Sequence, residues 1–262
     1  SGPAGLLSCL AADLRVSAEK MEAANVLAGP AAAAISVRNG KVNAKIAELQ
    51  IFDGVVRGAV EIDMAANPPA FSVRTTARDI SLSRFAALMG TGDLIEGRGV
   101  VNVDMQGRGL TQEAVLASLK GHSKIYVSEG GSFGPDLLAM LAMLEPIANK
   151  EPDLSAFLKP DFKTFRAEIF ADNGVIAART LEINRAGWLM SGDAKLIPAR
   201  EHIEGQLKIR RGVDSATLVR SPLSALERQT LTFEGYWHHP TVMLNGKVLM
   251  QGGQSGAGSY PN

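Results

Sequence analysis

Long segments of this chain alternate apolar with polar residues, and asparagine–glycine pairs separate several of them at hairpin spacing. Two such pairs are Asn39-Gly40 and Asn173-Gly174. Strict alternation is typical of a strand with one buried face, and Asn-Gly is the strongest short-range signal for a two-residue hairpin. Together the two patterns predict an antiparallel sheet made of long hairpins.

Strand signals occupy residues 13–80 and return from residue 162 onward. Asp53-Gly54 predicts another turn, and Asn67-Pro68-Pro69 is expected to stop a strand. A short helix is expected at 81–89, with Ser81 as its N-cap. The chain therefore combines many strands with a few short helices, which is the pattern of an α+β protein.

Residues 97–134 are expected to form a strand, a short helix and a second strand, with glycines at each joint. Gly107 and Gly109 are expected to break the first strand. Thr111 is a suitable N-cap for the helix, and Gly121 is expected to be its C′ residue. This unit contains no acid–base pair, metal cluster or nucleophile, so it indicates a binding surface.

Residues 135–148 form the most apolar segment of the chain. They predict a helix that is too short to span a bilayer, which takes about 20 apolar residues. Two interpretations remain open for it: a buried core helix, or a helix that closes one end of an apolar groove.

The charge balance restricts the partners of this chain. Lys and Arg number 27, as do Asp and Glu, so the formal net charge is zero. Proteins that bind nucleic acid through its phosphates carry a basic excess, and anionic membrane surfaces also attract basic segments. We therefore expect no nucleic-acid partner. Cys9 is the single cysteine, so no internal disulfide forms.

Catalytic signals are absent from the sequence. The four histidines lack further ligands at metal-binding spacing, and the adjacent His238 and His239 would point to opposite faces of a strand. Gly97-Arg98-Gly99 lacks the Lys-Ser/Thr of a phosphate-binding loop. No H-E-x-x-H motif occurs. We expect a protein without enzymatic activity, cofactor or metal.

These observations predict an α+β fold, predominantly antiparallel β, in which long curved sheets form a groove or a sandwich. Residues 1–12 are expected to be a lead-in that includes a cloning remnant. The main domain is expected over 13–250, as two β-rich halves (13–134 and 162–250) joined by helices in 135–160. Residues 251–262 are expected to be a flexible tail. Base rates favour a sandwich, whereas an open trough would hold acyl chains.

The order of these segments resembles the C-terminal region of the AsmA-like proteins of Gram-negative bacterial envelopes. The similar segments are GRGVVNVDMQGRGLTQEAVLASLKGHSKIYVSEGGSFGPDLLAML (97–141), FKTFRAEIFADNGVIAARTLEINRAGWLMSGDAKLIP (162–198), LQIFDGVVRGAVEIDMAANPPAFSVRTTARDISLSRFAALMG (49–90) and FEGYWHHPTV (233–242). The resemblance implies a periplasmic domain anchored to the inner membrane by an N-terminal helix upstream. It also implies curved β-grooves that carry phospholipid toward the outer membrane, and a role in outer-membrane biogenesis.

The leading hypothesis is therefore a domain that binds or conveys phospholipid acyl chains. The residues expected to line its groove are Val101, Val103, Met105, Leu137, Leu138, Leu141, Ile169, Val175, Leu181, Ile183, Leu207 and Ile209. A second hypothesis is an assembly factor that contacts outer-membrane or other envelope proteins through an exposed strand edge. A third is a hydrolase of unknown type that uses one of the histidines.

Overall fold

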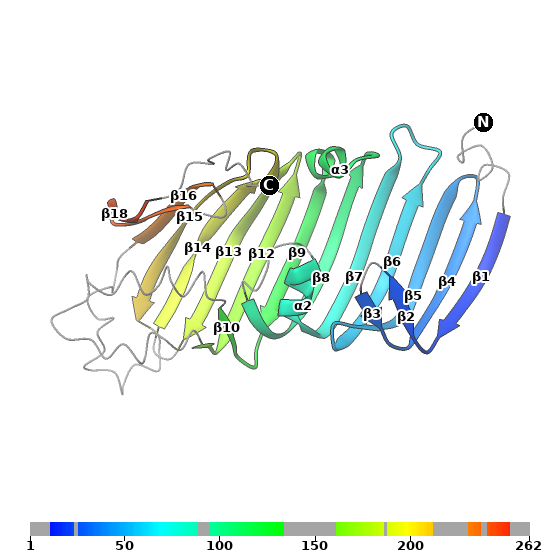
Figure 1. Ribbon diagram of the computed structural model, residues 1–262, viewed down its shortest axis with the longest axis horizontal. Helices are drawn as coiled ribbons and strands as arrows, with labels where there is room; N and C mark the ends of the chain where they lie inside the picture. The colour runs from blue at the N-terminus through cyan, green and yellow to red at the C-terminus, as the bar shows by residue number, and fades with distance from the viewer. Residues whose placement is uncertain are drawn as a thin grey trace, which may run out of the picture.

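The computed structural model describes residues 11–23, 26–88, 95–133, 161–185, 188–211, 230–236 and 240–251. Sixteen of its strands form one antiparallel sheet, and two more, β2 (Met21–Ala23) and β3 (Val26–Ala28), form a separate hairpin. Figure 1 shows the strands side by side along the long axis of the molecule. The predicted class, mostly antiparallel β in a long curved sheet with few helices, is confirmed.

The sheet follows chain order from one edge to the other. Its first part consists of β1 (Ala11–Ala18), β4 (Ala31–Arg38), β5 (Lys41–Ile51), β6 (Gly54–Asp63), β7 (Ala70–Ser81), β8 (Ile95–Arg108) and β9 (Lys120–Val127). The second part consists of β12 (Thr164–Asp172), β13 (Val175–Arg185), β14 (Trp188–Ile197), β15 (His202–Arg211), β16 (Thr230–Tyr236), β17 (Thr241–Leu244) and β18 (Lys247–Met250). Two short strands, β10 (Gly131–Phe133) and β11 (Asp161–Phe162), pair beside β8.

The pairing of β9 with β12 joins the two β-rich parts into a single sheet. Eight residue pairs connect these strands, from Phe165 opposite Val127 to Asp172 opposite Lys120. The described strands of both parts therefore share one continuous pair of faces.

The tight turns confirm two predictions and correct a third. Asn39-Gly40 and Asn173-Gly174 form hairpin turns in which all four residues have positive φ, as a type I′ turn requires. The turn predicted at Asp53-Gly54 is wrong by one residue, because Phe52 and Asp53 occupy the turn at φ 54° and 62° and Gly54 begins β6.

The 97–134 unit has the predicted order, but two of its glycines have other roles. Thr111 caps α3 (Gln112–Ser118) by accepting a hydrogen bond from the backbone N–H of Ala114 at 3.2 Å. Gly121 is not the C′ residue of α3, because the helix ends at Ser118, Leu119 is its C-cap and β9 begins at Lys120. Gly107 does not break the strand and lies inside β8.

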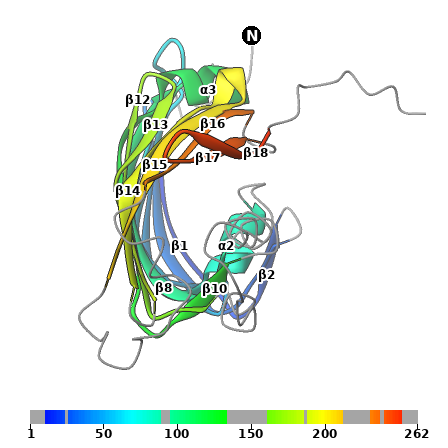
Figure 2. The ribbon, with the colours of Figure 1, turned by 90° about the vertical axis from the view of Figure 1, so that its left-hand side faces the viewer.

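The sheet curves, and α2 (Leu82–Leu88) lies inside the curve. Figure 2 shows α2 and β2 on the concave side, with the sheet bending around them. Ser81 caps the N-terminus of this helix as predicted, because its Oγ accepts a hydrogen bond from the Arg84 backbone N–H at 3.4 Å. The predicted helix at 135–148, with Leu137, Leu138 and Leu141, lies outside the described residues.

Candidate functional site

The sheet register aligns apolar side chains into rows that cross the sheet. Residues directly opposite each other in an antiparallel pair point to the same face, so the register defines each row. The Met105 row contains Leu14, Ile35, Ala44, Val60, Val73, Met105, Gly121, Ala171, Ile176, Leu196, Ile203 and Gly235. No member of this row has a polar side chain.

Two further rows run beside it on the same face. The Val103 row contains Val16, Ala33, Ile46, Gly58, Thr75, Val103, Ser123, Ile169, Ala178, Ala194, Gly205, Phe233 and Val242. The Val101 row contains Ala18, Ala31, Leu49, Val56, Ala77, Val101, Ile125, Ala167, Leu181, Gly192, Leu207, Leu231 and Leu244. These rows carry no charged side chain from β1 to β17, so the three rows together form one apolar face.

The opposite face of the same strands carries charged residues that form ion pairs, all between neighbouring strands except Arg166–Glu168 within β12. The ion pairs are Arg38–Asp13 at 2.6 Å, Lys41–Asp63 at 3.0 Å, Arg57–Glu48 at 3.0 Å, Arg74–Asp104 at 3.0 Å, Lys120–Asp172 at 3.7 Å, Lys124–Glu168 at 3.3 Å, Arg166–Glu168 at 2.9 Å and Lys195–Glu204 at 2.9 Å. This polar face is the one expected to meet water, and its ion pairs match the zero net charge of the chain.

The apolar face is the concave one. Leu82 of α2 is buried in the same cluster as Ile80, Val101 and Val127, and Phe85 packs against that cluster. Since α2 lies inside the curve of the sheet (Figure 2), the face that it contacts points inward. The curvature therefore places the three apolar rows on the inner surface and the ion pairs on the outer one.

Burial divides the apolar face into two regions. Every buried apolar residue of the described main sheet lies at Ala77 or later in the chain, with Val101 only 2% exposed. We call the described part from β7 to β17 the packed region. On β1 to β6, no apolar side chain of the three rows is buried, and Leu14 and Val16 are 54% and 40% exposed. We call this part the accessible region.

Eight of the groove residues predicted from the sequence lie on the apolar face. They are Val101, Val103, Met105, Ile169, Leu181, Ile183, Leu207 and Ile209. Val101, Ile183, Leu207 and Ile209 are buried in the packed region, whereas the other four are half-buried. The structure thus brings all eight onto one surface, and lipid contact at these positions stays a prediction.

Val175 lies on the opposite, polar face, which corrects the prediction for that residue. It pairs with Asp172, and Asp172 pairs with Lys120. The cause is a register shift between Ala178 and Leu181, which inverts the alternation within β13. Ile176 therefore takes the position on the apolar face that the sequence pattern assigned to Val175.

None of the groove residues predicted from the sequence lies in the accessible region. Ile35, Ile46 and Val60 are half-buried on the apolar face, and Ile62 is 37% exposed. The alternation of apolar and polar residues that predicted these strands also indicates which of their side chains lie on the apolar face. Alternation does not indicate which part of the apolar face is buried by other elements, because that burial depends on contacts between distant segments of the chain.

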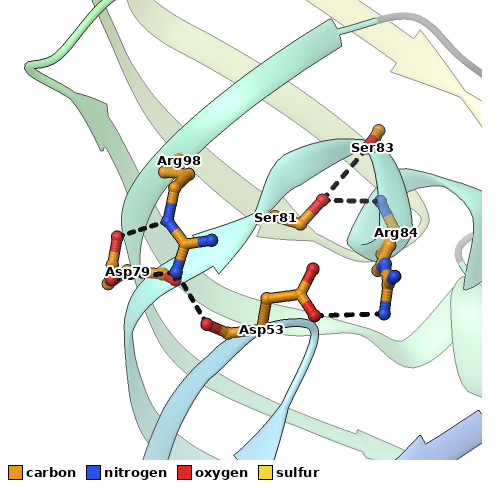
Figure 3. Close-up of polar contacts among 6 residues, drawn as sticks. All are labelled: Asp53, Asp79, Ser81, Ser83, Arg84 and Arg98. Atoms are coloured by element: carbon orange, nitrogen blue, oxygen red, sulfur yellow. Dashed lines mark hydrogen bonds and ion pairs between the residues drawn. The ribbon is translucent and has the colours of Figure 1, made fainter.

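Polar contacts fix α2 over the edge of the apolar face (Figure 3). The Nε of Arg98 donates to Oδ1 of Asp79 at 2.7 Å, and an Nη2 hydrogen bond reaches the backbone oxygen of Asp53 at 2.7 Å. The Asp53 carboxylate in turn pairs with Arg84 of α2 at 3.2 Å. The Arg98 guanidinium lowers the pKa of Asp79 by hydrogen bonding to its charged form.

An aromatic contact supports the same anchor. The rings of Phe52 and Phe85 meet edge to face, with centroids 6.2 Å apart and planes at 79°. Phe52 reaches α2 because the left-handed turn at Phe52 and Asp53 follows β5 directly. The turn, β7, β8 and α2 are thus joined into one unit at this rim of the sheet.

A separate depression of about 580 Å³ lies near the other rim. Its lining includes Lys41, Asn43, Glu61, Ser72 and Gln106 from the polar face, together with Val42, Ile62 and Phe71 from the apolar face. The lining of this depression is therefore mixed in polarity.

Other kinds of site lack support in the part of the chain that the structure describes. No group of three or more His, Cys, Asp or Glu side chains there could hold a metal ion. Among the same residues, no helix has the length and apolar character needed to cross a membrane.

A family model described as the AsmA family matches residues 4–181, which is more than half of the chain. The chain belongs to the AsmA family. No curated protein and no solved structure matches it. Membership of the AsmA family supports a role in the bacterial envelope, in outer-membrane assembly or a lipid-related process.

Proposed function

We propose that this AsmA-family chain binds phospholipid acyl chains along its concave apolar face. The observation that carries the proposal is the set of three uncharged rows that continue from strand to strand across the sheet. A soluble domain rarely exposes large apolar patches without a ligand or partner to cover them. Acyl chains are long and apolar, so they match a surface that extends in one direction without charged side chains.

The dimensions of the sheet fit this ligand. The three rows cross twelve or thirteen strands, and neighbouring strands lie about 4.8 Å apart, so each row is about 55 Å long. The hydrocarbon core of a bilayer, two acyl chains deep, is about 30 Å thick. One row could therefore contact several acyl chains placed end to end.

The accessible region is the proposed entry surface. Its apolar side chains are half-buried or exposed, so a ligand can contact them without displacing the core around Val101. Burying apolar area contributes about 25 cal/mol per Å², and the absence of charged side chains in the three rows means that no ion is desolvated. The polar convex face would remain in water.

In the envelope, such a surface would shield lipid from water between the inner and outer membranes. We propose that the domain acts in the periplasm, attached to the inner membrane by a segment upstream, and that it conveys phospholipid rather than catalysing a reaction. Phospholipid is its proposed partner.

Photo-crosslinking from neighbouring residues on opposite faces tests the proposal. Ile62 and Glu61 are adjacent in β6 and both exposed, but Ile62 points to the apolar face and Glu61 to the polar face. A photoreactive benzophenone amino acid at each position is incubated with phospholipid vesicles, irradiated and analysed by mass spectrometry. We expect lipid adducts from position 62 and few from position 61.

Two results would contradict lipid binding by this face. One is the absence of adducts from position 62 when the protein is folded. The other is equal labelling from both positions, which would indicate nonspecific contact with the vesicles.

The edge strand β1 favours a second candidate function, the assembly of outer-membrane proteins by strand addition. Among the described residues, β1 pairs only with β4, and this function would require a partner strand to pair with its other edge. This function predicts crosslinks from β1 to envelope proteins, and it predicts no lipid adducts from Ile62.

A further inference from the structure

Ser123 is a buried polar residue on the apolar face of the sheet. It is 7% exposed, and the register places it in the Val103 row, between Val103 of β8 and Ile169 of β12. Its hydroxyl has no hydrogen-bond partner within the described part of the chain. Such groups are rare in folded proteins, because burial removes the hydrogen bonds that a hydroxyl makes to water.

The side chains around Ser123 do not satisfy this hydroxyl. Its neighbours on the same face are Gly121 and Ile125 along β9, and Val103 and Ile169 across the sheet. None of these side chains has a polar atom, and the β9 backbone already pairs with β8 on one side and with β12 on the other. An ordered water needs about two to four polar partners, so this position does not suit water. The missing partner is therefore expected from a ligand that brings an acceptor.

A ligand on the concave face comes within reach of Ser123. Val103, Ile125 and Ile169 have larger side chains than serine, yet each of them is only half-buried. Gly121 contributes no side chain on the remaining side. Because the larger neighbours keep part of their surface accessible, a ligand that lies on them would place its acceptor next to the Ser123 hydroxyl.

A second hydroxyl lies nearby in the same row. Thr75 and Ser123 are the only polar side chains in the three described rows, and they flank Val103 on β7 and β9. Thr75 is half-buried, and its hydroxyl also lacks a hydrogen-bond partner among the residues that the structure describes. Two strand spacings separate the two residues, or about 10 Å. The polar groups of the three rows are thus gathered in one place on an otherwise apolar surface.

We propose that the Ser123 hydroxyl donates a hydrogen bond to an ester carbonyl of bound phospholipid, with Thr75 beside the same polar region of the lipid. This inference rests on the proposed function and adds where along the apolar face the ester groups lie. An ester carbonyl is an uncharged acceptor that is joined directly to an acyl chain. A phosphate or a free carboxylate would instead place a charge on rows that have no cation to pair with it.

The space beside this position fits an acyl chain. Six strand spacings separate β9 from β1 along the sheet, which is about 29 Å. One layer of the hydrocarbon core of a bilayer is half of its full thickness, or about 15 Å. A chain whose ester group lies at Ser123 can therefore extend along the Val103 row into the accessible region.

Competition between ester-linked and ether-linked lipids tests the contact. Vesicles contain equal amounts of a diacyl phosphatidylethanolamine and of its dialkyl ether analogue, which has the same head group and chain lengths but no carbonyl. After incubation, the lipid that is recovered with the protein is quantified by mass spectrometry. The unchanged chain should recover about fivefold more ester than ether lipid, as expected for one neutral hydrogen bond.

Serine variants assign the preference to one hydroxyl. Ser123→Ala should recover the two lipids in nearly equal amounts. Ser191→Ala is the matched control, because Ser191 is a half-buried serine on the polar face of β14, and it should keep the ester preference. A preference that survives in Ser123→Ala, or none in the unchanged chain, would overturn the ester contact and leave lipid binding in place. Recovery of neither lipid by the folded chain would overturn the proposed function and this inference with it.

Thermal unfolding without lipid tests whether the hydroxyl is unpaired. Ser123→Ala should raise the Tm by about 3 °C, because alanine removes a buried group that the fold leaves unsatisfied. Ser191→Ala should change the Tm by less than about 1 °C. A lower Tm for Ser123→Ala would show that the hydroxyl has a partner inside the fold, and this result would overturn the proposal.

Discussion

Gly121 lies in β9 opposite Met105, within the uncharged Met105 row. Its φ of 139° is unusual for residues with a side chain, and a Cβ there would lie 2.1 Å from the backbone oxygen of Asp104. The neighbouring strand can approach this closely only because the side chain is absent. Gly246, in the turn between β17 and β18, also has positive φ (81°) but would have no atom within 4 Å of a Cβ.

We therefore expect a glycine-to-alanine substitution to lower the free energy of unfolding more at position 121 than at position 246. Gly121→Ala should lower the free energy of unfolding by about 3 kcal/mol, because it adds a clash with backbone to the conformational cost. Gly246→Ala should cost about 1 kcal/mol, from conformation alone. Urea denaturation of both variants measures the difference. Equal costs would show that the strands relax around Gly121.

Charged residues on the convex face should make stability depend on pH. The hydrogen bonds from Arg166 and then Lys124 lower the pKa of Glu168. A carboxylate whose pKa is lower in the folded state than in the unfolded state stabilises the fold above its ordinary pKa. That stabilisation is lost as the pH falls through the lowered value. Glu48, Asp63 and Glu204 have pKa values shifted in the same direction by cationic partners.

We therefore expect the free energy of unfolding to decrease as the pH falls below about 4.5, the region where model carboxylates titrate. Glu168→Gln should be less stable than the unchanged chain at pH 7, and this difference should shrink in acid. Denaturation curves at pH 7, 5 and 3 provide the measurement. A constant difference across that range would contradict the assignment of Glu168.

At the scale of elements, α2 is held more by apolar than by ionic contacts. Leu82 is buried in the core, and Phe85 packs against that core and against Phe52. The Arg84–Asp53 pair joins side chains that are 64% and 47% exposed, and exposed ion pairs contribute little. The polar contacts in Figure 3 orient the helix, while burial supplies most of its stabilisation.

A double-mutant cycle checks this division. Phe85→Ala should destabilise the protein by about 2 kcal/mol, less than a fully buried phenylalanine because Phe85 is half-buried. Combining it with Phe52→Ala should reveal a coupling energy of about 1 kcal/mol from the edge-to-face contact. Arg84→Ala, the control for the ion pair, should cost under about 1 kcal/mol. A larger loss for Arg84→Ala than for Phe85→Ala would reverse the assignment.

At the scale of the whole molecule, the single sheet separates two chemical environments. The concave face collects the uncharged rows, and the convex face collects the ion pairs, because every strand alternates between them. Ser123 is the only buried polar or charged residue among the described ones, and it lies in the Val103 row. The proposed lipid site is therefore a property of the assembled sheet and of no single strand.

A carboxylate on the concave face should impair lipid binding more than one on the convex face. Val60 and Ala59 are neighbours in β6, both half-buried, and they point to the apolar and polar faces respectively. Val60→Glu should reduce the phospholipid recovered per mole of protein about tenfold, since lipid would have to desolvate a charge. Ala59→Glu should leave recovery nearly unchanged. Circular dichroism confirms folding of both, and equal losses would contradict a site on the concave face.

The amino-acid sequence by itself determined the strands and their turns. Alternation and the Asn-Gly pairs are local signals, so Asn39-Gly40, Asn173-Gly174 and the Thr111 cap follow from nearby residues alone. The same local pattern assigned eight described groove residues to one face. The resemblance to AsmA-like proteins, which rests on the order of these segments, agrees with the family match over residues 4–181.

Only the tertiary structure decided which strands share a sheet, where the alternation inverts and what covers the apolar face. Local alternation fits a sandwich as well as a single sheet, and the pairing of β9 with β12 selects a single sheet for the described strands. The register shift between Ala178 and Leu181 put Ile176 instead of Val175 on the apolar face, because one extra residue inverts the alternation before a bulge relative to the alternation after it. Burial of Val101 beside α2, and exposure of Leu14 at the edge, depend on contacts between segments far apart in the chain.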